Sequence, residues 1–409
     1  MATPHSSPTV VIVGAGHAGG TLAGILRQQK FDGRIVLCGD ETHPPYHRPP
    51  LSKKYTDDEY VHWLKPESFY ADNGIDIRLG DPVVHLDTDA RTVTTTSGTV
   101  LEYTTLVLAT GAAPRTLTLP GSDLAGVVSL RTLADAAQLR EAVHTGAALA
   151  VIGGGYVGLE VAASARSRGC HVTVIEREER VLARVASPEL SRALTEFHRD
   201  RGTRIVTGAE VGQITGTGGR VAGVSLTDGT EIPCDLVLVG VGAIPNDALA
   251  RQAGLDCLAG IVVDGSSRTS DPHVLAIGDV TYRLHDTLGK MVRLESIPSA
   301  VEQAKQAAAV IAGAPQPPHE TPWFWSDQFD LKMKMAGILT PGTRAVLRGN
   351  PSGSSFALFH IDDDGVPVTV ETVNAAAEFM AGKRFIGDRT RVDPAALADP
   401  ATALREAVL

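Results

Sequence analysis

The sequence predicts an α/β protein that contains two domains of one parallel-sheet architecture. A β-branched run, a glycine-rich turn and an apolar helical stretch follow one another at residues 9–29, and the same series recurs at residues 148–169. A later pair of segments repeats too, because LVLATGAAPR at 106–115 and LVLVGVGAIPN at 236–246 are both apolar strands that enter a glycine turn. Such internal similarity indicates one structural unit used twice.

The length and composition are those of an ordinary globular protein. The chain has 409 residues, 43% of them hydrophobic and 21% charged, which favours two or three domains. No apolar run approaches the ~20 residues of a membrane span, and the polar start MATPHSSPT lacks the features of a secretory signal. We therefore expect a soluble, cytoplasmic protein with no membrane partner. The net charge of −10 argues against a nucleic-acid partner.

The cysteines and histidines form no pattern typical of a disulfide framework or a metal site. The four cysteines are scattered without a CxxC pair, so we expect small buried side chains rather than a thiol relay. The 13 histidines show no ligand spacing with cysteine or acid, so we predict no metal site. The cysteines are Cys38, Cys170, Cys234 and Cys257.

The first glycine-rich turn has the form of a dinucleotide-binding fingerprint. Gly14, Gly16 and Gly19 follow a strand and open a helix, so the amides from Gly14 to Ala18 can face a pyrophosphate. The next strand, RIVLCGDE, brings Asp40 and Glu41 to its carboxyl end about twenty residues later, where this fold places an acid on the adenosine ribose. We take Asp40 as the better candidate.

The second turn repeats this logic with Gly153, Gly155 and Gly158, and the following strand ends at Glu176. A carboxylate at this position accepts hydrogen bonds from a free 2′-hydroxyl and repels a 2′-phosphate, so NADH is favoured over NADPH. The neighbouring Arg177 and Arg180 weigh against that preference.

Other side chains have patterns that indicate a role. Arg48 precedes two prolines and suits a fixed phosphate contact, and Asp279 follows the apolar strand VLAIG. Arg131 comes directly before TLAD, a candidate capping box. Glu160 is an acid in an otherwise apolar helical face. At such a position we expect its carboxylate to pair with another residue rather than to reach solvent.

The sequence resembles pyridine-nucleotide-dependent flavoproteins with two dinucleotide-binding domains, and more closely the ferredoxin reductases of bacterial oxygenase systems, of the putidaredoxin reductase and rhodocoxin reductase type. The segments that carry this resemblance cover almost the whole chain: YHRPPLSKKY (46–55), LATGAAPR (108–115), SLRTLADA (129–136), GGGYVGLEVAA (153–163), SDPHVLAIGDV (270–280), LESIPSAVEQA (294–304) and WFWSDQ (323–328). It implies a glutathione reductase-like fold in which the NAD domain is inserted in the FAD domain, with an α+β C-terminal domain. The expected boundaries are 1–114 and 245–321 for the FAD-binding domain, 115–244 for the NAD-binding domain and 322–409 for the interface domain.

The resemblance also implies the residues of each site. Lys53, paired with Glu160, is expected beside the flavin as the catalytic pair. The expected FAD-binding residues are Gly14, Gly16, His17, Ala18, Asp40, Arg48, Lys53, Val83, Ala109, Thr110, Gly111, Arg131, Gly278, Asp279, Ile297 and Trp325. The expected NAD-binding residues are Gly153, Gly155, Tyr156, Gly158, Glu160, Glu176, Arg184 and Gly242.

The activity that the resemblance implies is transfer of electrons from NADH through FAD, one at a time, to a two-iron two-sulfur ferredoxin. A haem-thiolate monooxygenase or a Rieske oxygenase would consume them. Disulfide reductases and NADH peroxidases share the fold but need a cysteine near the flavin, and ETHPPYHRPP after Asp40 contains none. A membrane quinone reductase would need an anchor that ALADPATALREAVL does not provide. A redox-gated binding module and another NADH-dependent flavin reductase remain alternatives.

A positive stretch near the C-terminus suggests where a ferredoxin docks. The alternation in LKMKMAG predicts a strand with Lys332 and Lys334 on the exposed face and Met333 and Met335 inward. No acidic residue lies between Leu331 and Ile361, whereas Arg344 and Arg348 do, in addition to these lysines. Lys305 matches a position that the resemblance places on the same side. An acidic ferredoxin would be steered towards such a rim.

Overall fold

The structure, a computed structural model, describes residues 7–285 and 289–409. Most of the polar N-terminal stretch MATPHSSPT thus lies outside the described residues. The chain divides into two compact units. The first unit contains Met1–His47, His62–Ala113 and Ile244–Glu320, and the second contains Arg48–Val61, Pro114–Ala243 and Thr321–Leu409. Two short strands, β8 (Ala112–Pro114) and β17 (Ala243–Pro245), span the boundaries between these ranges.

A five-stranded parallel sheet organises the first unit, with the strand order β19-β7-β1-β2-β3. Its β-branched strands are buried on both faces, as is typical of parallel sheets. The strands of this unit are β1 (Thr9–Val13), β2 (Arg34–Gly39), β3 (Ile75–Leu79), β4 (Val83–Asp87), β5 (Thr92–Thr95), β6 (Val100–Glu102), β7 (Thr105–Leu108), β18 (Ile261–Val263), β19 (Val274–Ala276), β20 (Thr281–His285) and β21 (Lys290–Val292).

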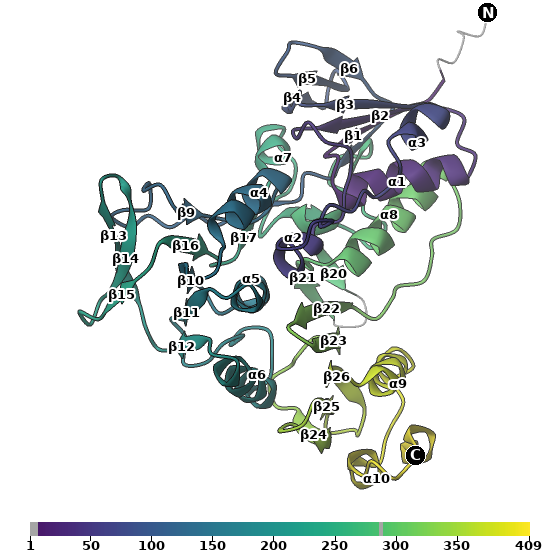
Figure 1. The fold of residues 1–409 in the computed structure, drawn as a ribbon. Helices are drawn as coiled ribbons and strands as arrows, with labels where there is room; N and C mark the ends of the chain where they lie inside the picture. The colour runs from purple at the N-terminus through teal and green to yellow at the C-terminus, as the bar shows by residue number, and fades with distance from the viewer. Residues whose placement is uncertain (1–6, 286–288) are drawn as a thin grey trace, which may run out of the picture. The chain divides into compact units, whose positions relative to one another are not determined.

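Two long helices cover one face of this sheet and lie side by side in Figure 1. They are α1 (His17–Gln28) and α8 (Ile297–Ala312), and their alanines and leucines pack on the buried face that contains Ile12 and Leu37. Small residues in both helices allow this close approach. The other helices of the unit are α3 (Ser68–Asp72), α7 (Ala248–Gln252) and the 3-10 helix η1 (Gly278–Val280).

The second unit contains another five-stranded parallel sheet, here called the second parallel sheet, with the order β12-β11-β10-β16-β9. The pairing of β1 with its two neighbours is repeated by β10, which pairs with β11 and β16. The elements up to this point of the unit are α2 (Pro50–Lys53), β9 (Val127–Val128), α4 (Leu133–Ala142), β10 (Ala148–Ile152), α5 (Tyr156–Ser167), β11 (His171–Ile175), α6 (Pro188–Asp200), β12 (Arg204–Val206), β13 (Val211–Thr217), β14 (Arg220–Leu226), β15 (Glu231–Pro233) and β16 (Leu236–Val239).

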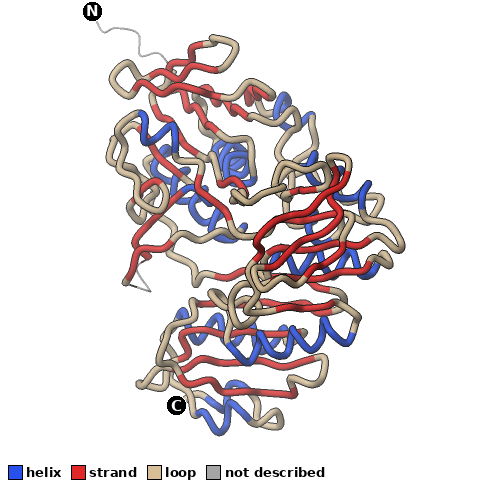
Figure 2. The backbone as a smooth tube through the Cα atoms, turned by 90° about the vertical axis from the view of Figure 1, so that its left-hand side faces the viewer, coloured by secondary structure: helices blue, strands red, loops and turns tan. Residues whose placement is uncertain are grey.

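The same unit ends in a five-stranded antiparallel sheet, the C-terminal sheet, with the order β22-β23-β26-β25-β24. Figure 2 shows its strands as neighbouring red segments near the marked C-terminus. Helix α9 packs on one face of the sheet, where Val370 and Phe359 form the core. The elements are β22 (Trp323–Gln328), β23 (Leu331–Gly337), β24 (Arg344–Asn350), β25 (Ser355–Ile361), β26 (Pro367–Val373), α9 (Ala376–Gly387), α10 (Pro394–Ala398) and the 3-10 helix η3 (Leu404–Ala407).

These elements confirm the α/β class and the repeated strand–turn–helix series. The alternation predicted for LKMKMAG is confirmed for Met333 and Met335, which are buried, and for Lys332, which is exposed, whereas Lys334 is half-buried. Among the described residues, no helix combines the length and apolar character that crossing a membrane requires.

Candidate functional site

The first candidate site lies where the strands β1, β2, β7 and β19 of the first unit reach their carboxyl ends. Gly14 follows β1 with φ +117, a conformation that side chains rarely adopt, and a Cβ there would lie 2.2 Å from the carbonyl oxygen of Ala109. A Cβ on Gly19 would lie 2.1 Å from the carbonyl oxygen of Gly14. These two glycines are therefore required by the packing of the turn itself.

Gly16 is different from its two partners in the fingerprint. Its φ of −84 is accessible to any residue, and no protein atom lies within 4 Å of where its Cβ would be. The protein alone gives no steric reason for glycine at this position. A ligand that approaches the backbone at the N-terminus of α1, such as a pyrophosphate, does give one. The cradle thus fits a dinucleotide such as FAD.

His17 begins α1 beside this cradle, and its ring lies edge-on to that of His47 with 5.1 Å between the centroids. Burial lowers the pKa of His17 to about 4, and His47 contributes to this, while the charge of Asp279 opposes it. A neutral imidazole is also compatible with the positive end of a helix. A Cβ on Gly278 would lie 3.0 Å from the Cβ of Ala18, so η1 reaches the same end of the sheet as the start of α1.

The acids after β2 occupy different environments. Glu41 accepts a 2.6 Å hydrogen bond from the hydroxyl of Tyr46, whereas Asp40 is exposed. The strand registers pair Val13 with Cys38 and Ile152 with Ile175, so the position that corresponds to Glu176 in the first sheet is Gly39. Asp40 thus lies one residue beyond that register position. Its proposed contact with the ribose stays a prediction.

The remaining predicted residues of the first unit lie after β7 and in η1, α1, β4 and α8. Thr110 follows β7 and donates a 2.7 Å hydrogen bond to the carbonyl of Asn246. Gly278 begins η1, and its N–H donates to the buried Gln303, a support that the sequence did not reveal. Further positions are Ala18 in α1, Val83 at the start of β4, Ala109 and Gly111 after β7, Ile297 at the start of α8, and Lys305, which pairs with Glu320.

The second candidate site repeats the geometry of the first. Gly153 has φ +111 and its Cβ would lie 2.4 Å from the carbonyl oxygen of Gly240, while the Cβ of Gly158 would lie 2.3 Å from that of Gly153. Gly155 has φ −78 and, like Gly16, has no atom within 4 Å of its Cβ position. Two turns of different sequence therefore have the same opening above a helix N-terminus, and both fit a dinucleotide.

The carboxylate of Glu176 is fixed at the edge of this second cradle. Its oxygens accept hydrogen bonds from the amides of Gly154 at 2.7 Å and Glu178 at 2.9 Å. The structure changes the expected influence of Arg180, whose guanidinium donates to the carbonyls of Ala183 and Ala186 and to the hydroxyl of Ser191. Arg180 is thus bound within its own loop rather than presented to a phosphate.

Two other cations lie near the same edge. Arg177 is exposed and forms an ion pair with Glu178 at 3.2 Å. Arg184 is exposed, and one of its guanidinium nitrogens lies 3.8 Å from the Cβ position of Gly242. Arg184 and Gly242, both expected in the nucleotide site, are therefore brought together.

Glu160 lies in α5 with only 3% of its surface exposed, and the expected pairing with Lys53 is confirmed at 2.7 Å. The carboxylate also accepts hydrogen bonds from Ser52 and Ser326, both at 2.5 Å. Burying a carboxylate is costly unless its oxygens are paired, and these donors satisfy that requirement. The sequence did not predict either serine, because they come from α2 and β22, far from residue 160 in the chain.

Arg48, Arg131 and Trp325 also belong to the second unit. Arg48 donates a 2.5 Å hydrogen bond to the carbonyl of Arg131. The capping box that follows Arg131 is confirmed, since Thr132 and Asp135 cap α4 reciprocally. Trp325 is half-buried in β22, and its ring lies 5.8 Å from that of Trp323.

The positive stretch of the C-terminal sheet is smaller than expected. Lys332 and Arg344 are exposed, and Lys334 lies 5.4 Å from the ring centre of Phe379. Arg348, however, is 7% exposed and forms no part of a surface rim. It donates hydrogen bonds to the carbonyls of Leu397, Asp399, Pro400 and Thr402 and to the carboxylate of Glu378.

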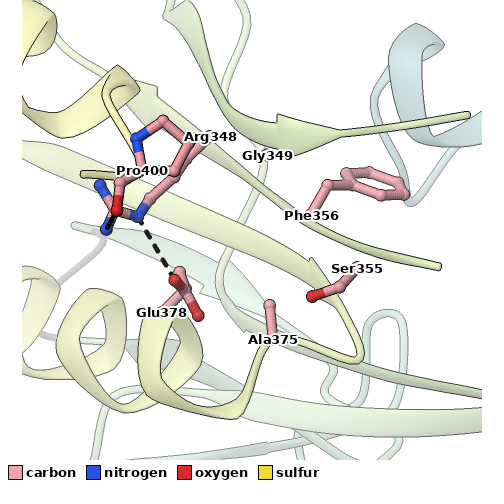
Figure 3. A pocket seen from close by; sticks show the side chains of 7 residues that line it. All are labelled: Arg348, Gly349, Ser355, Phe356, Ala375, Glu378 and Pro400. Atoms are coloured by element: carbon pink, nitrogen blue, oxygen red, sulfur yellow. Dashed lines mark hydrogen bonds and ion pairs between the residues drawn. The ribbon is translucent and has the colours of Figure 1, made fainter. Parts of the chain in front are cut away.

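A cavity of about 240 Å³ next to Arg348 is shown in Figure 3, with the bond from Arg348 to Glu378 drawn as a dashed line. The guanidinium that borders it is already saturated by these acceptors, so it has no donor to offer a ligand. The role of Arg348 is to hold the C-terminal segment onto β24.

The cysteines of the described part of the chain lie in environments that disfavour the thiolate. All four cysteines are free, Cys38, Cys170 and Cys234 are buried as expected, and Cys257 is half-buried. Burial raises the pKa of Cys38 and of Cys234 to about 11, which is typical of unreactive thiols. Residues 7–285 and 289–409 contain no cluster of three potential metal ligands.

Comparison with known proteins agrees with this geometry. Residues 8–304 match the family model of the pyridine nucleotide-disulphide oxidoreductases, and residues 323–408 match a reductase C-terminal model. The chain is 47% identical over 402 residues to a probable ferredoxin reductase of Castellaniella defragrans, covering 97% of this chain and 98% of that protein. It is 39% identical to the putidaredoxin reductase of Pseudomonas putida, covering 99% and 97%.

Solved structures show the same relationship. The fold matches the reductase in the covalent putidaredoxin reductase–putidaredoxin complex with a TM-score of 0.94 and 38% identity, covering 98% of both chains. It matches the ferredoxin reductase for the CYP199A2 system of Rhodopseudomonas palustris with a TM-score of 0.93 and 42% identity, covering 98% of this chain and all of that one. The chain therefore belongs to the pyridine nucleotide-disulphide oxidoreductase family, whose members are oxidoreductases that use FAD and NAD(P)H.

Proposed function

We propose that this protein is a FAD-containing NADH:ferredoxin reductase of an oxygenase system. The observation that carries the proposal is the pair of equivalent cradles. In each, no protein atom would clash with a side chain at the middle glycine, whereas a bound ligand would. FAD would occupy the first and NADH the second. Relatives named ferredoxin reductases, similar over nearly the full length of both chains, support the reaction class. The acceptor would be a two-iron two-sulfur ferredoxin that serves a haem-thiolate monooxygenase or a Rieske oxygenase.

The residues proposed for FAD follow from the sequence expectations and their placement. The amides at the start of α1 would bind the pyrophosphate, Asp40 the adenosine ribose and Asp279 the ribitol. We further propose that Lys53 and Glu160 serve the flavin ring, with Arg48, Arg131 and Trp325 as additional contacts. When bound, the flavin supplies the conversion of a two-electron donor into single-electron transfers. The expected three-domain division of the chain, with boundaries near 114, 245 and 321, is part of the same proposal.

The proposed preference for NADH over NADPH rests on Glu176 and on the hydrogen bonds that hold Arg180 within the protein. The fixed carboxylate suits a 2′-hydroxyl, and only Arg177 and Arg184 of the nearby cations are exposed. Glu176→Ala should narrow the ratio of kcat/KM for NADH over NADPH by about ten- to a hundredfold, since a hydrogen bond to a charged group contributes ~1.5–3 kcal/mol. Arg177→Ala is the matched control. A wild-type preference for NADPH would contradict the proposal.

The ferredoxin is proposed to dock beside Lys332 and Lys334, with Lys305 as a further contact. These two lysines of β23 lie on the face of the C-terminal sheet that carries Phe379 of α9. Reversing both to glutamate should raise the KM for ferredoxin and flatten its salt dependence, because electrostatic steering is lost. Reduction of ferricyanide by NADH should stay nearly unchanged.

A matched control is available in the same sheet. Arg344→Glu reverses an exposed charge in β24, which β26 and β25 separate from β23. It should leave the KM for ferredoxin nearly unaltered. If the ferredoxin and ferricyanide rates fell together in the lysine variant, these lysines would belong to folding or flavin chemistry rather than to partner recognition.

A further inference from the structure

We propose that Glu371, in strand β26 of the C-terminal sheet, is a positioning residue for the nucleotide site of the second parallel sheet. The inference rests on the proposed binding of NADH at Glu176 and the Gly153–Gly158 turn. It assigns a role in nucleotide binding to a part of the chain that contains neither of these features. All the residues concerned belong to the second unit.

Glu371 is 1% exposed, and both of its carboxylate oxygens have a buried partner. Oε1 accepts a 2.9 Å hydrogen bond from the backbone amide of Ser187. Oε2 lies 2.9 Å from Nε2 of His360, which is 3% exposed in the neighbouring strand β25. Because Ser187 is the N-cap of α6, the carboxylate also lies at the positive end of that helix. The contact is therefore specific in both geometry and charge.

Ser187 is the last residue of the segment 177–187, which begins directly after Glu176. The middle of this segment is tied to the fingerprint, since the amide of Leu182 donates a 2.9 Å hydrogen bond to the carbonyl of Gly154. Leu182 has φ +55, a conformation that a leucine adopts only when its surroundings enforce it. The guanidinium of Arg180 cross-links the rest of the segment to α6. Gly154 and Glu371 thus hold the segment at two points.

The fingerprint helix α5 also packs against the C-terminal sheet, through Tyr156. Tyr156, the first residue of α5, is half-buried, but its hydroxyl is buried. Burial raises the pKa of Tyr156 well above its ordinary value, and the charges of Glu371 and Glu160 raise it further. The ring of Tyr156 lies edge-on to that of Phe324 in β22, with 5.0 Å between the centroids. The C-terminal sheet therefore borders both the segment and the fingerprint helix.

Packing alone does not explain an acid at position 371. Of the neighbours on the same face of the sheet, Met335, Leu358 and Val373 are apolar and buried, whereas Thr369 and His360 are polar and buried. An apolar residue would pack against the first three, but it would leave His360 and the amide of Ser187 without their buried acceptor. The carboxylate therefore joins His360 of β25 to the amide of Ser187, and through the bond to Ser187 it gives the nucleotide segment a fixed end.

The test measures NAD⁺ affinity of the FAD-loaded protein by calorimetry. Glu371→Met removes the acceptors at similar volume and should raise the Kd for NAD⁺ about three- to tenfold, the range of coupling carried by residues that touch no ligand. Glu371→Gln, whose amide oxygen can still accept from Ser187, should restore the Kd to within about twofold of wild type. The kcat for ferricyanide at saturating NADH should change little, because Glu371 touches no reacting atom.

Val370→Ala is the matched structural control. This valine is the preceding residue of β26, is fully buried and packs on the opposite face against α9. It should lower the melting temperature while leaving the Kd for NAD⁺ unchanged. If Glu371→Met and Val370→Ala changed the melting temperature alike and neither altered the Kd, the proposal would be overturned.

A measurement on the wild-type protein covers the case in which Glu371→Met does not fold. NAD⁺ should slow amide hydrogen exchange in peptides covering 356–373 as well as in those covering 176–191. Protection confined to the second parallel sheet and its loops would contradict the proposed coupling. The proposed NADH site is tested separately with Glu176→Ala, and an unchanged Kd for NAD⁺ in that variant would refute the site. If Glu176→Ala changed the Kd and Glu371→Met did not, only the positioning role of Glu371 would be refuted.

Discussion

The two kinds of glycine in each fingerprint predict opposite consequences for alanine. At Gly155, φ is −78 and the Cβ position is open, so Gly155→Ala should change the free energy of unfolding by less than about 1 kcal/mol. At Gly153, φ is +111 and the new methyl would lie 2.4 Å from the carbonyl oxygen of Gly240. The left-handed backbone alone should cost about 1–2 kcal/mol there, and the clash adds to it.

Gly155→Ala, which should barely change stability, should clearly weaken nucleotide binding. The methyl of Gly155→Ala would occupy the space through which a pyrophosphate approaches the amides of α5. We expect the KM for NADH to rise at least about tenfold, equivalent to ~1.4 kcal/mol, with FAD content unchanged. Gly16→Ala should instead lower the affinity for FAD.

The assay combines urea unfolding, flavin content and steady-state reduction of ferricyanide for each variant. An unchanged KM for NADH in Gly155→Ala would refute the assignment of the second cradle to the nucleotide. Equal destabilisation by Gly155→Ala and Gly153→Ala would refute the steric reasoning.

Three further predictions concern folding and the flavin. Burial lowers the pKa of His198 to about 4, so between pH 6.5 and 4 the unfolded chain binds a proton that the native state does not. The free energy of unfolding should therefore fall by up to ~3 kcal/mol as the pH is lowered over this range. In urea titrations, His198→Gln should make the free energy of unfolding less dependent on pH. Ser326→Ala should lower that free energy at pH 7 by ~1.5–3 kcal/mol, since Glu160 loses a buried donor, and no change would contradict the arrangement. Acid precipitation should release all the flavin, and flavin retained on the precipitate would disprove noncovalent binding.

Local sequence rules predicted the features whose cause is local. A glycine with positive φ, a β-branched strand and an acid at the end of the next strand are all encoded within about thirty residues, so both cradles and their order were readable. The alternation of Lys332, Met333, Lys334 and Met335 likewise has a cause within the strand itself.

The features that were missed depend on distant segments. Ser326 meets Glu160 only because β22 packs against α5, and Glu371 meets Ser187 only because α6 contacts the C-terminal sheet. A positive charge in the sequence also does not show by itself whether the side chain lies at the surface or in the interior. Arg348 was grouped with the surface lysines, yet the carbonyls of the C-terminal segment bind it in the interior.

The central claim is that electrons pass from NADH through the bound flavin to a ferredoxin. The most direct measurement mixes the purified holoprotein anaerobically with a limiting amount of NADH and an excess of a two-iron two-sulfur ferredoxin such as putidaredoxin, and follows both chromophores by stopped-flow absorbance. We predict that the flavin absorbance bleaches first and that about two ferredoxins are reduced per NADH, since a hydride carries two electrons and each cluster accepts one. A flavin that neither NADH nor NADPH reduces, or one that is reduced but transfers no electrons to any two-iron two-sulfur ferredoxin, would contradict it.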